Sequence, residues 1–154
     1  RKRSEHLLDK GVIIKAFCWY GLLSSIISTA AYFFVNYQNG WPNVALAANG
    51  SIYMRATTMA LGAIVFTQVA NVLNCRTNTV SVFKKGLFEN KNIWYGIIFE
   101  IILFVILTIT PGIQQLLNTT ILTASDWLFL FLLPIPLVLL DELRKWLMYH
   151  HKNI

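Results

Sequence analysis

The stretch ATTMALGAIVFTQVANVL, residues 56–73, contains no charged side chain in 18 positions. A helix needs roughly 20 predominantly apolar residues to cross the hydrocarbon core of a bilayer, which is about 30 Å thick. This stretch therefore predicts a transmembrane helix, which we expect to cover residues 56–75. The polar residues within it are amides and hydroxyls, which commonly form hydrogen bonds between helices in a membrane.

Three further apolar segments flank this one, and we expect them to span over residues 16–35, 93–110 and 127–147. Charged residues make up 13% of the 154-residue chain, against about 25% in a typical soluble domain. The alternation of apolar and polar residues expected of a membrane β-barrel is absent. The sequence therefore predicts an all-α, multi-pass integral membrane protein, with residues 1–154 forming a single four-helix transmembrane domain.

The basic residues predict the orientation of the spans. Twelve of the 13 Lys and Arg residues lie before the first span, between the second and third, or after the fourth, and only Arg55 lies on the other side. Because basic loops remain in the cytoplasm, we expect both termini and the 76–92 loop to be cytoplasmic. The same distribution argues against a nucleic-acid partner, since the basic residues mark topology.

The remaining local features fit this arrangement. Residues 36–55 are rich in turn-forming residues, and Thr110-Pro111-Gly112 predicts the end of the third helix. Cys18 and Cys75 lie near the cytoplasmic ends of their spans, so we expect both to be reduced thiols. The chain begins with Arg1 rather than Met, and we expect it to be part of a longer protein.

Glu100 is the one acidic residue deep inside a span. An ionisable group at bilayer depth costs roughly 2.5–3.5 kcal/mol on insertion scales and usually faces the interior of the bundle. Gln68, on the neighbouring antiparallel span, lies at a similar depth, roughly 10 Å from the cytoplasmic edge. We therefore expect Gln68 and Glu100 to face each other.

Asn71 adds a second amide close to this depth, on one helix face with Thr67, Asn74 and Asn78. Carboxylate and amide oxygens are the ligands that hard cations prefer. Gln68, Asn71 and Glu100 thus form a candidate cation site, which is only partial because calcium needs six or more ligands. The alternative is a set of structural hydrogen bonds between helices.

The fourth span contains two features of its own. Pro134 and Pro136 remove two backbone donors, which predicts a kink. Asp141 is spaced to pair with Arg144 and Lys145 on one helix face. These charges form either a solvated helix end or a dock for a cytoplasmic domain. No catalytic or cofactor-binding motif occurs anywhere in the chain: it has no phosphate-binding Gly-rich loop, metal-spaced Cys/His cluster or nucleophile elbow.

Several stretches resemble the membrane region of P-type cation ATPases. Residues 68–77, QVANVLNCRT, with SVFKKG at 81–86, resemble the eighth membrane helix and the following loop. The run ENKNIW at 89–94, leading to Glu100, is similar to the start of the ninth helix, and Pro111-Gly112 to its end. The runs DWL at 126–128 and LDELRK at 140–145 are similar to the tenth helix, and residues 1–8 resemble the connection after the sixth.

The resemblance covers essentially the whole chain and implies helices seven to ten of a type II pump of calcium or sodium/potassium type. In that family, ATP phosphorylates an Asp in a cytoplasmic domain, so ATP and Mg²⁺ are expected for the full-length pump. The phosphorylation motif is absent from these 154 residues. The segment alone is therefore expected to bind no cofactor and to be inactive. Its implied partners are the other domains of the pump, the lipid bilayer and the transported cation.

The resemblance also implies roles for individual residues. Gln68 matches a Glu ligand of sarcoplasmic-type calcium pumps. Asn71 matches an Asp that sodium/potassium pumps use for an additional sodium ion, and Glu100 matches a Glu of that same region. The amides at Gln68 and Asn71 depart from both patterns. The 36–55 loop resembles the one that docks an accessory subunit in sodium/potassium pumps.

Two other functions fit the four-span arrangement. One is a stand-alone membrane scaffold or assembly subunit. The other is an ion-conducting subunit, a small channel or proton-coupled carrier that uses Glu100.

Overall fold

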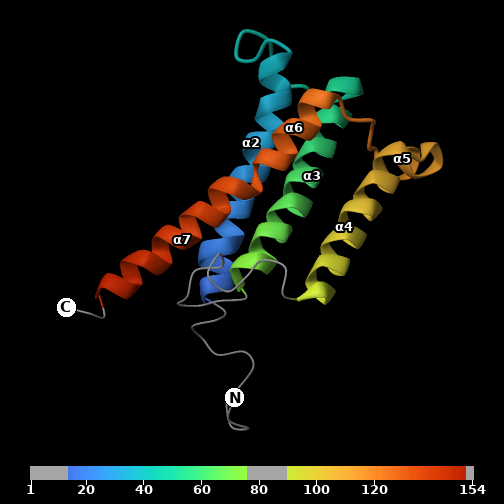
Figure 1. Ribbon diagram of the computed structural model, residues 1–154. Helices are drawn as coiled ribbons and strands as arrows, with labels where there is room; N and C mark the ends of the chain where they lie inside the picture. The colour runs from blue at the N-terminus through green and yellow to red at the C-terminus, as the bar shows by residue number, and fades with distance from the viewer. Residues whose placement is uncertain (1–13, 76–89, 152–154) are drawn as a thin grey trace.

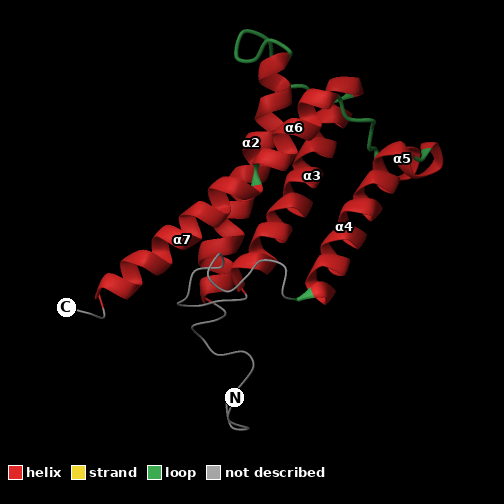
Figure 2. Ribbon diagram, viewed as in Figure 1, coloured by secondary structure: helices red, strands yellow, loops and turns green. Residues whose placement is uncertain are grey.

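The computed structural model describes residues 14–75 and 90–151, and every regular element within these ranges is a helix. Four helical segments are long and apolar enough to cross a membrane: Phe17–Gln38, Gly50–Cys75, Lys91–Ile109 and Ala124–Leu147. They run side by side (Figure 1), and the loops that join them lie at the ends of the helices (Figure 2). The predicted all-α fold with four spans is confirmed.

The first span begins as a π-helix, η1 (Lys15–Gly21), and continues without a break into α2 (Leu22–Gln38). The two join smoothly because Gly21 and Leu22 both keep right-handed helical backbone angles. A π-helical stretch is rare and redirects the side chains that follow it. Here it contains Tyr20, which is 5% exposed.

The second span, α3 (Gly50–Cys75), starts six residues before the predicted position. Arg55 interrupts the apolar run, but the residues before it extend the same helix as far as Gly50, where φ is +77°. Small residues bring α2 and α3 close together: Ala31 and Ala63 are fully buried, and the Ser28 hydroxyl donates a 3.0 Å hydrogen bond to the Ala60 carbonyl. Packing of small residues is the usual basis of helix association in membranes.

The third span, α4 (Lys91–Ile109), begins where the side-chain oxygen of Asn90 accepts a hydrogen bond from the Asn92 amide. The predicted stop is confirmed, but the chain does not become irregular there. It forms another short helix, α5 (Pro111–Leu117), because a proline without an N–H and with a fixed φ suits the first position of a helix. Figure 1 shows α5 turned aside at the end of α4.

The fourth span consists of two helices, α6 (Ala124–Leu132) and α7 (Pro134–His151). They meet at Leu133, and the break arises because Pro134 has no N–H to continue the helix. The predicted kink is confirmed, and α7 leans away from the axis of α6 (Figure 1).

The helix ends next to the basic segments gather at one end of the bundle. Figure 1 shows the start of η1, the end of α3, the start of α4 and the end of α7 at this end. The helix ends that adjoin the basic segments thus lie on one side of the bundle (Figure 1), as the prediction from the distribution of Lys and Arg requires. The assignment of this end to the cytoplasm stays a prediction.

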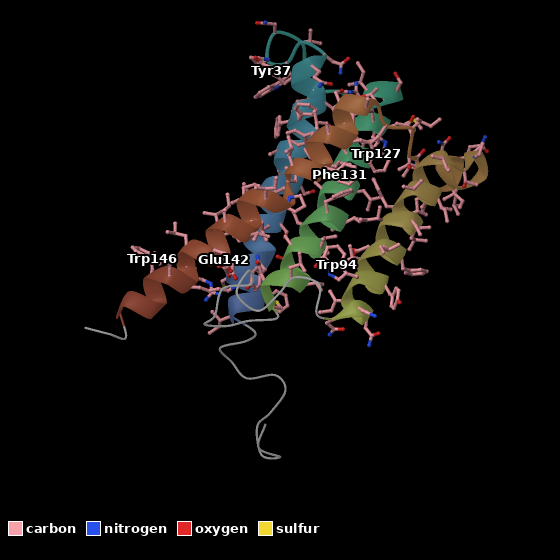
Figure 3. All side chains as sticks on the ribbon, in the orientation of Figure 1. Tyr37, Trp94, Trp127, Phe131, Glu142 and Trp146 are labelled. Carbon is pink, nitrogen blue, oxygen red and sulfur yellow. The ribbon has the colours of Figure 1, made fainter. Side chains whose placement is uncertain are left out.

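Three spans meet at Gly62 in the middle of α3. A Cβ atom at this position would lie 2.7 Å from Cζ of Phe104 on α4 and 2.8 Å from Cδ1 of Leu130 on α6. Around this contact, Phe66 packs edge to face against Phe104, with ring centroids 6.5 Å apart, and Trp127 packs against Phe104 at 5.7 Å. Figure 3 shows Trp127 and Phe131 on α6. Glycine is required here because neighbouring helices occupy the space of a side chain.

We predict that Gly62→Ala destabilises the bundle by about 1–3 kcal/mol, because the added methyl group forces Phe104 and Leu130 out of position. The measurement is the free energy of unfolding of the protein in detergent micelles. Gly96→Ala on α4 is the matched control, since nothing lies within 4 Å of its Cβ position. The control should change stability by less than about 1 kcal/mol. An equal loss from both variants would contradict close packing at Gly62.

Candidate functional site

The structure places the three predicted cation ligands in different surroundings. Gln68 is exposed on α3, whereas Asn71 on α3 and Glu100 on α4 are half-buried. Among residues 14–75 and 90–151, no hydrogen bond or ion pair joins Gln68 to Glu100. Two side chains that share a cation need not bond each other directly, so the missing hydrogen bond does not test the expected pairing. The pairing of Gln68 with Glu100 stays a prediction.

Asn71 and Asn74 turn toward the neighbouring spans. Nδ2 of Asn71 donates to the Ser24 hydroxyl of α2 at 3.3 Å, and Nδ2 of the fully buried Asn74 donates to the Leu137 carbonyl of α7 at 3.3 Å. Both side-chain oxygens are buried and accept no hydrogen bond from the described residues. Two amide oxygens are therefore available at the junction of three helices. Asn78, expected on the same face, lies outside the described residues.

These groups do not amount to a complete metal site. Among the described residues, no group of three or more His, Cys, Asp or Glu side chains is placed to hold a metal ion. The available ligands are one carboxylate, on Glu100, and neutral amides, fewer than the six to eight oxygens that calcium takes. A cation site at Gln68, Asn71 and Glu100 therefore stays a prediction, and such a site would need further oxygens to complete it.

A buried group of charges lies where α7 passes η1. Asp141 is fully buried; its Oδ1 lies 2.8 Å from Arg144, and its Oδ2 lies 3.0 Å from the ammonium of Lys145, which is 3% exposed. The Tyr20 hydroxyl donates a 3.1 Å hydrogen bond to Asp141 Oδ1. Glu142 pairs with Lys145 from the next position, also at 3.0 Å.

This arrangement confirms the predicted spacing of the pairs but corrects one interpretation. Asp141 and Lys145 do not form a solvated helix end; they turn inward and join the first span to the last. Figure 3 shows Glu142 on the side of α7 toward η1 and Trp146 pointing away from the bundle. The charges are buried because each has an opposite charge within 3 Å, which offsets much of the cost of removing it from water.

A second ion pair, which the sequence did not reveal, joins half-buried Arg55 to fully buried Asp126 at the opposite end of the bundle. Arg55 on α3 contacts Asp126 on α6 through two bonds, Nε to Oδ2 at 2.8 Å and Nη2 to Oδ1 at 2.7 Å. Asp126 is fully buried and also accepts a 2.9 Å bond from the Thr123 amide. Arg55 donates to Gln38 of α2 at 2.8 Å, so the pair joins three helices.

One signal in the sequence could have indicated this pair. Thr123 and Asp126 have the spacing of a capping box, in which each side chain bonds the backbone amide of the other. That motif places Asp126 in the first turn of a helix at the membrane boundary, the same boundary as Arg55, the one basic residue between Lys15 and Arg76.

We predict that Asp141→Asn destabilises the protein by about 3 kcal/mol, because it removes a fully buried charge that pairs with both Arg144 and Lys145. Thermal or detergent-induced unfolding measures this change. Glu142→Gln, which removes a less buried partner of the same lysine, should cost no more than about 1 kcal/mol. The buried arrangement would be contradicted if the two variants unfolded alike.

Comparison with known proteins assigns the family. The family described as "Cation transporting ATPase, C-terminus" matches residues 1–147. The chain is 31% identical over 145 residues to calcium-transporting ATPase 1 of Saccharomyces cerevisiae, covering 94% of this chain and 14% of that protein. It is 27% identical over 145 residues to calcium-transporting ATPase type 2C member 2 of Mus musculus, with the same coverage of each.

The similarity extends to another branch of these enzymes. Over 169 aligned residues the chain is 27% identical to potassium-transporting ATPase alpha chain 2 of Rattus norvegicus, covering 94% of this chain and 16% of that protein. The chain thus spans 14–16% of the length of these relatives. Together with the four-span bundle, the match over residues 1–147 shows that the chain belongs to the cation-transporting ATPase C-terminal family, the C-terminal membrane region of P-type ATPases.

Proposed function

We propose that this chain is the membrane support of an ATP-driven cation pump of calcium or sodium/potassium type. In this role the four spans hold the ion-transport helices of the pump in position and contribute oxygen ligands to the cation path. The match to the family over residues 1–147 carries this proposal. ATP hydrolysis, with Mg²⁺, then takes place in parts of the pump outside this chain, and the segment alone is inactive.

The bundle supports such a role because ion pairs join its helices at both ends, while the Gln68 amide is exposed within a membrane-spanning helix. Buried ion pairs fasten it at both ends, which makes it a firm base for neighbouring helices. Gln68 is exposed in the middle of α3, where an amide facing lipid lacks hydrogen-bond partners. We infer that transport helices of the pump cover this side. Gln68, Asn71 and Glu100 then line one boundary of the ion path.

Exposed apolar residues within the 36–55 segment support the proposal that an accessory subunit docks there. Tyr37, Val44 and Leu46 are 69%, 56% and 41% exposed. The loop is nonetheless ordered, since Asn36 Oδ1 accepts a 3.1 Å bond from the Ala47 amide and the Tyr32 hydroxyl donates to the Ala47 carbonyl at 3.0 Å. A loop that is fixed by hydrogen bonds and exposes apolar side chains is suited to docking an accessory subunit.

The test is the cation dependence of ATPase activity in the complete protein. We predict that Glu100→Gln raises the cation concentration for half-maximal activity about tenfold, equivalent to ~1.4 kcal/mol of binding, because a charged ligand of the cation is lost. Tyr95→Phe is the control, since Tyr95 is 67% exposed on the same helix and should leave the curve unchanged.

Each outcome of that assay is informative. ATPase activity that no cation stimulates would contradict the proposed pump. Normal expression of Glu100→Gln with an unchanged cation curve would leave the pump intact but assign Glu100 to a structural role between helices. Cation flux through the chain in the absence of ATP would instead favour an ion-conducting subunit.

A further inference from the structure

The chain carries no charged residue from Ile101 to Ser125, a run of 25 positions. This run includes the end of α4, all of α5 and the connection to α6. In soluble domains about a quarter of the residues are charged, so the 111–123 connection lacks the composition of a loop in bulk water. A different environment must account for it.

The length of α4 locates this connection relative to the membrane. α4 has 19 residues, which at 1.5 Å per residue is about 28 Å, close to the hydrocarbon thickness of about 30 Å. The end of α4 at Ile109 therefore lies at the boundary between acyl chains and headgroups. α5 starts two residues later and turns aside at the end of α4 instead of continuing outward (Figure 1).

Several apolar side chains of this connection are exposed, whereas Leu122 packs into the core. Leu116 and Leu117 are 80% and 49% exposed, and Ile121 just beyond α5 is 65% exposed. At the adjoining end of α4, Ile106 and Ile109 are 41% and 54% exposed. The exposed apolar surface of a membrane-spanning helix thus adjoins exposed apolar side chains of an uncharged segment that does not span.

Three polar residues of the same segment bond back to the bundle, whereas Gln115 and Asn118 are exposed. The Thr119 hydroxyl donates to the Leu107 carbonyl at 2.7 Å, and the Thr120 amide donates to the Thr58 hydroxyl of α3 at 3.1 Å. The Gln114 side chain donates to the Thr108 carbonyl. These bonds cap free carbonyls that a lipid environment cannot satisfy and hold α5 in its sideways position.

We propose that residues 111–121 form an interfacial lipid-binding segment. α5 lies in the plane of the membrane, at the face opposite the basic segments, with Leu116, Leu117 and Ile121 among the upper acyl chains. Interfacial helices combine apolar burial with attraction of basic residues to anionic lipid. Because this segment has no charge, its occupant is the acyl chains of bilayer lipid, and its binding depends on apolar contact alone and not on the charge of the headgroup.

The test uses the complete protein in phosphatidylcholine vesicles that contain a carbene-forming diazirine dissolved in the lipid. After photolysis and proteolysis, mass spectrometry should find the label on residues 111–121 as well as on α4. Leu116→Glu should lower labelling of the segment about threefold, because a carboxylate draws this side of α5 toward water. Gln115→Glu, one position away on a different side of α5, should leave labelling unchanged.

Anionic lipid and salt provide a second readout. Replacing a third of the phosphatidylcholine by phosphatidylglycerol, or raising the salt concentration, should not change labelling if the contact is apolar. Absence of label from residues 111–121 while α4 is labelled would overturn the proposal. In that case, modification of the segment by a water-soluble carbene reagent would place it in solvent, and protection from both reagents would place it against protein.

Discussion

The ion pair between Arg55 and Asp126 is the interaction on which the end of the bundle away from the basic segments depends. Arg55 is the one charged residue between Lys15 and Arg76, and Asp126 is the one charged residue between Glu100 and Asp141. Each residue is the counter-charge of the other, and two hydrogen bonds of 2.8 and 2.7 Å join their side chains. A buried charge that loses its partner is strongly destabilising, so the pair fixes α3 against α6 and, through Gln38, against α2.

The opposite end is held in the same way with different residues. Asp141 and Lys145 turn into the bundle and, with Tyr20, join the last span to the first. Between the two ends the helices meet through small residues and aromatic rings, closest at Gly62. Between these ends, Gln68 and Glu100 make no hydrogen bond or ion pair among the described residues, and the side-chain oxygens of Asn71 and Asn74 accept none. This is the arrangement expected of a support whose functional contacts are made with other helices.

Hydropathy and proline chemistry predicted much of the fold, because both act locally. The four spans, the stop before Pro111 and the kink at Pro134 follow from composition over a few neighbouring residues. The first turns of α3 and the sideways course of α5 were not predicted, since Arg55 interrupts the apolar run of α3 and hydropathy does not give the direction of a short helix after a proline. The resemblance of short motifs to P-type ATPases led to the family that the match over residues 1–147 shows.

Contacts between distant residues were harder to predict. Arg55 and Asp126 are 71 positions apart and Tyr20 and Asp141 are 121 apart, so no local pattern links them. The sequence left two interpretations of Asp141 open, a solvated helix end or a docking surface. The spacing of charges along a helix does not show whether their side chains face solvent or the bundle. For the candidate cation site, helix periodicity gave the depth of Gln68 and Glu100, but whether a cation joins them depends on ligands that this chain does not supply.

A double-mutant cycle on Arg55 and Asp126 tests the central claim most directly. Arg55→Leu, Asp126→Leu and the double variant would be compared by their free energies of unfolding in detergent micelles. We expect each single change to cost about 3–5 kcal/mol, and the double change to cost less than the sum of the two by about 1–3 kcal/mol. Additive losses would show that the two residues stabilise the bundle independently and would contradict the account.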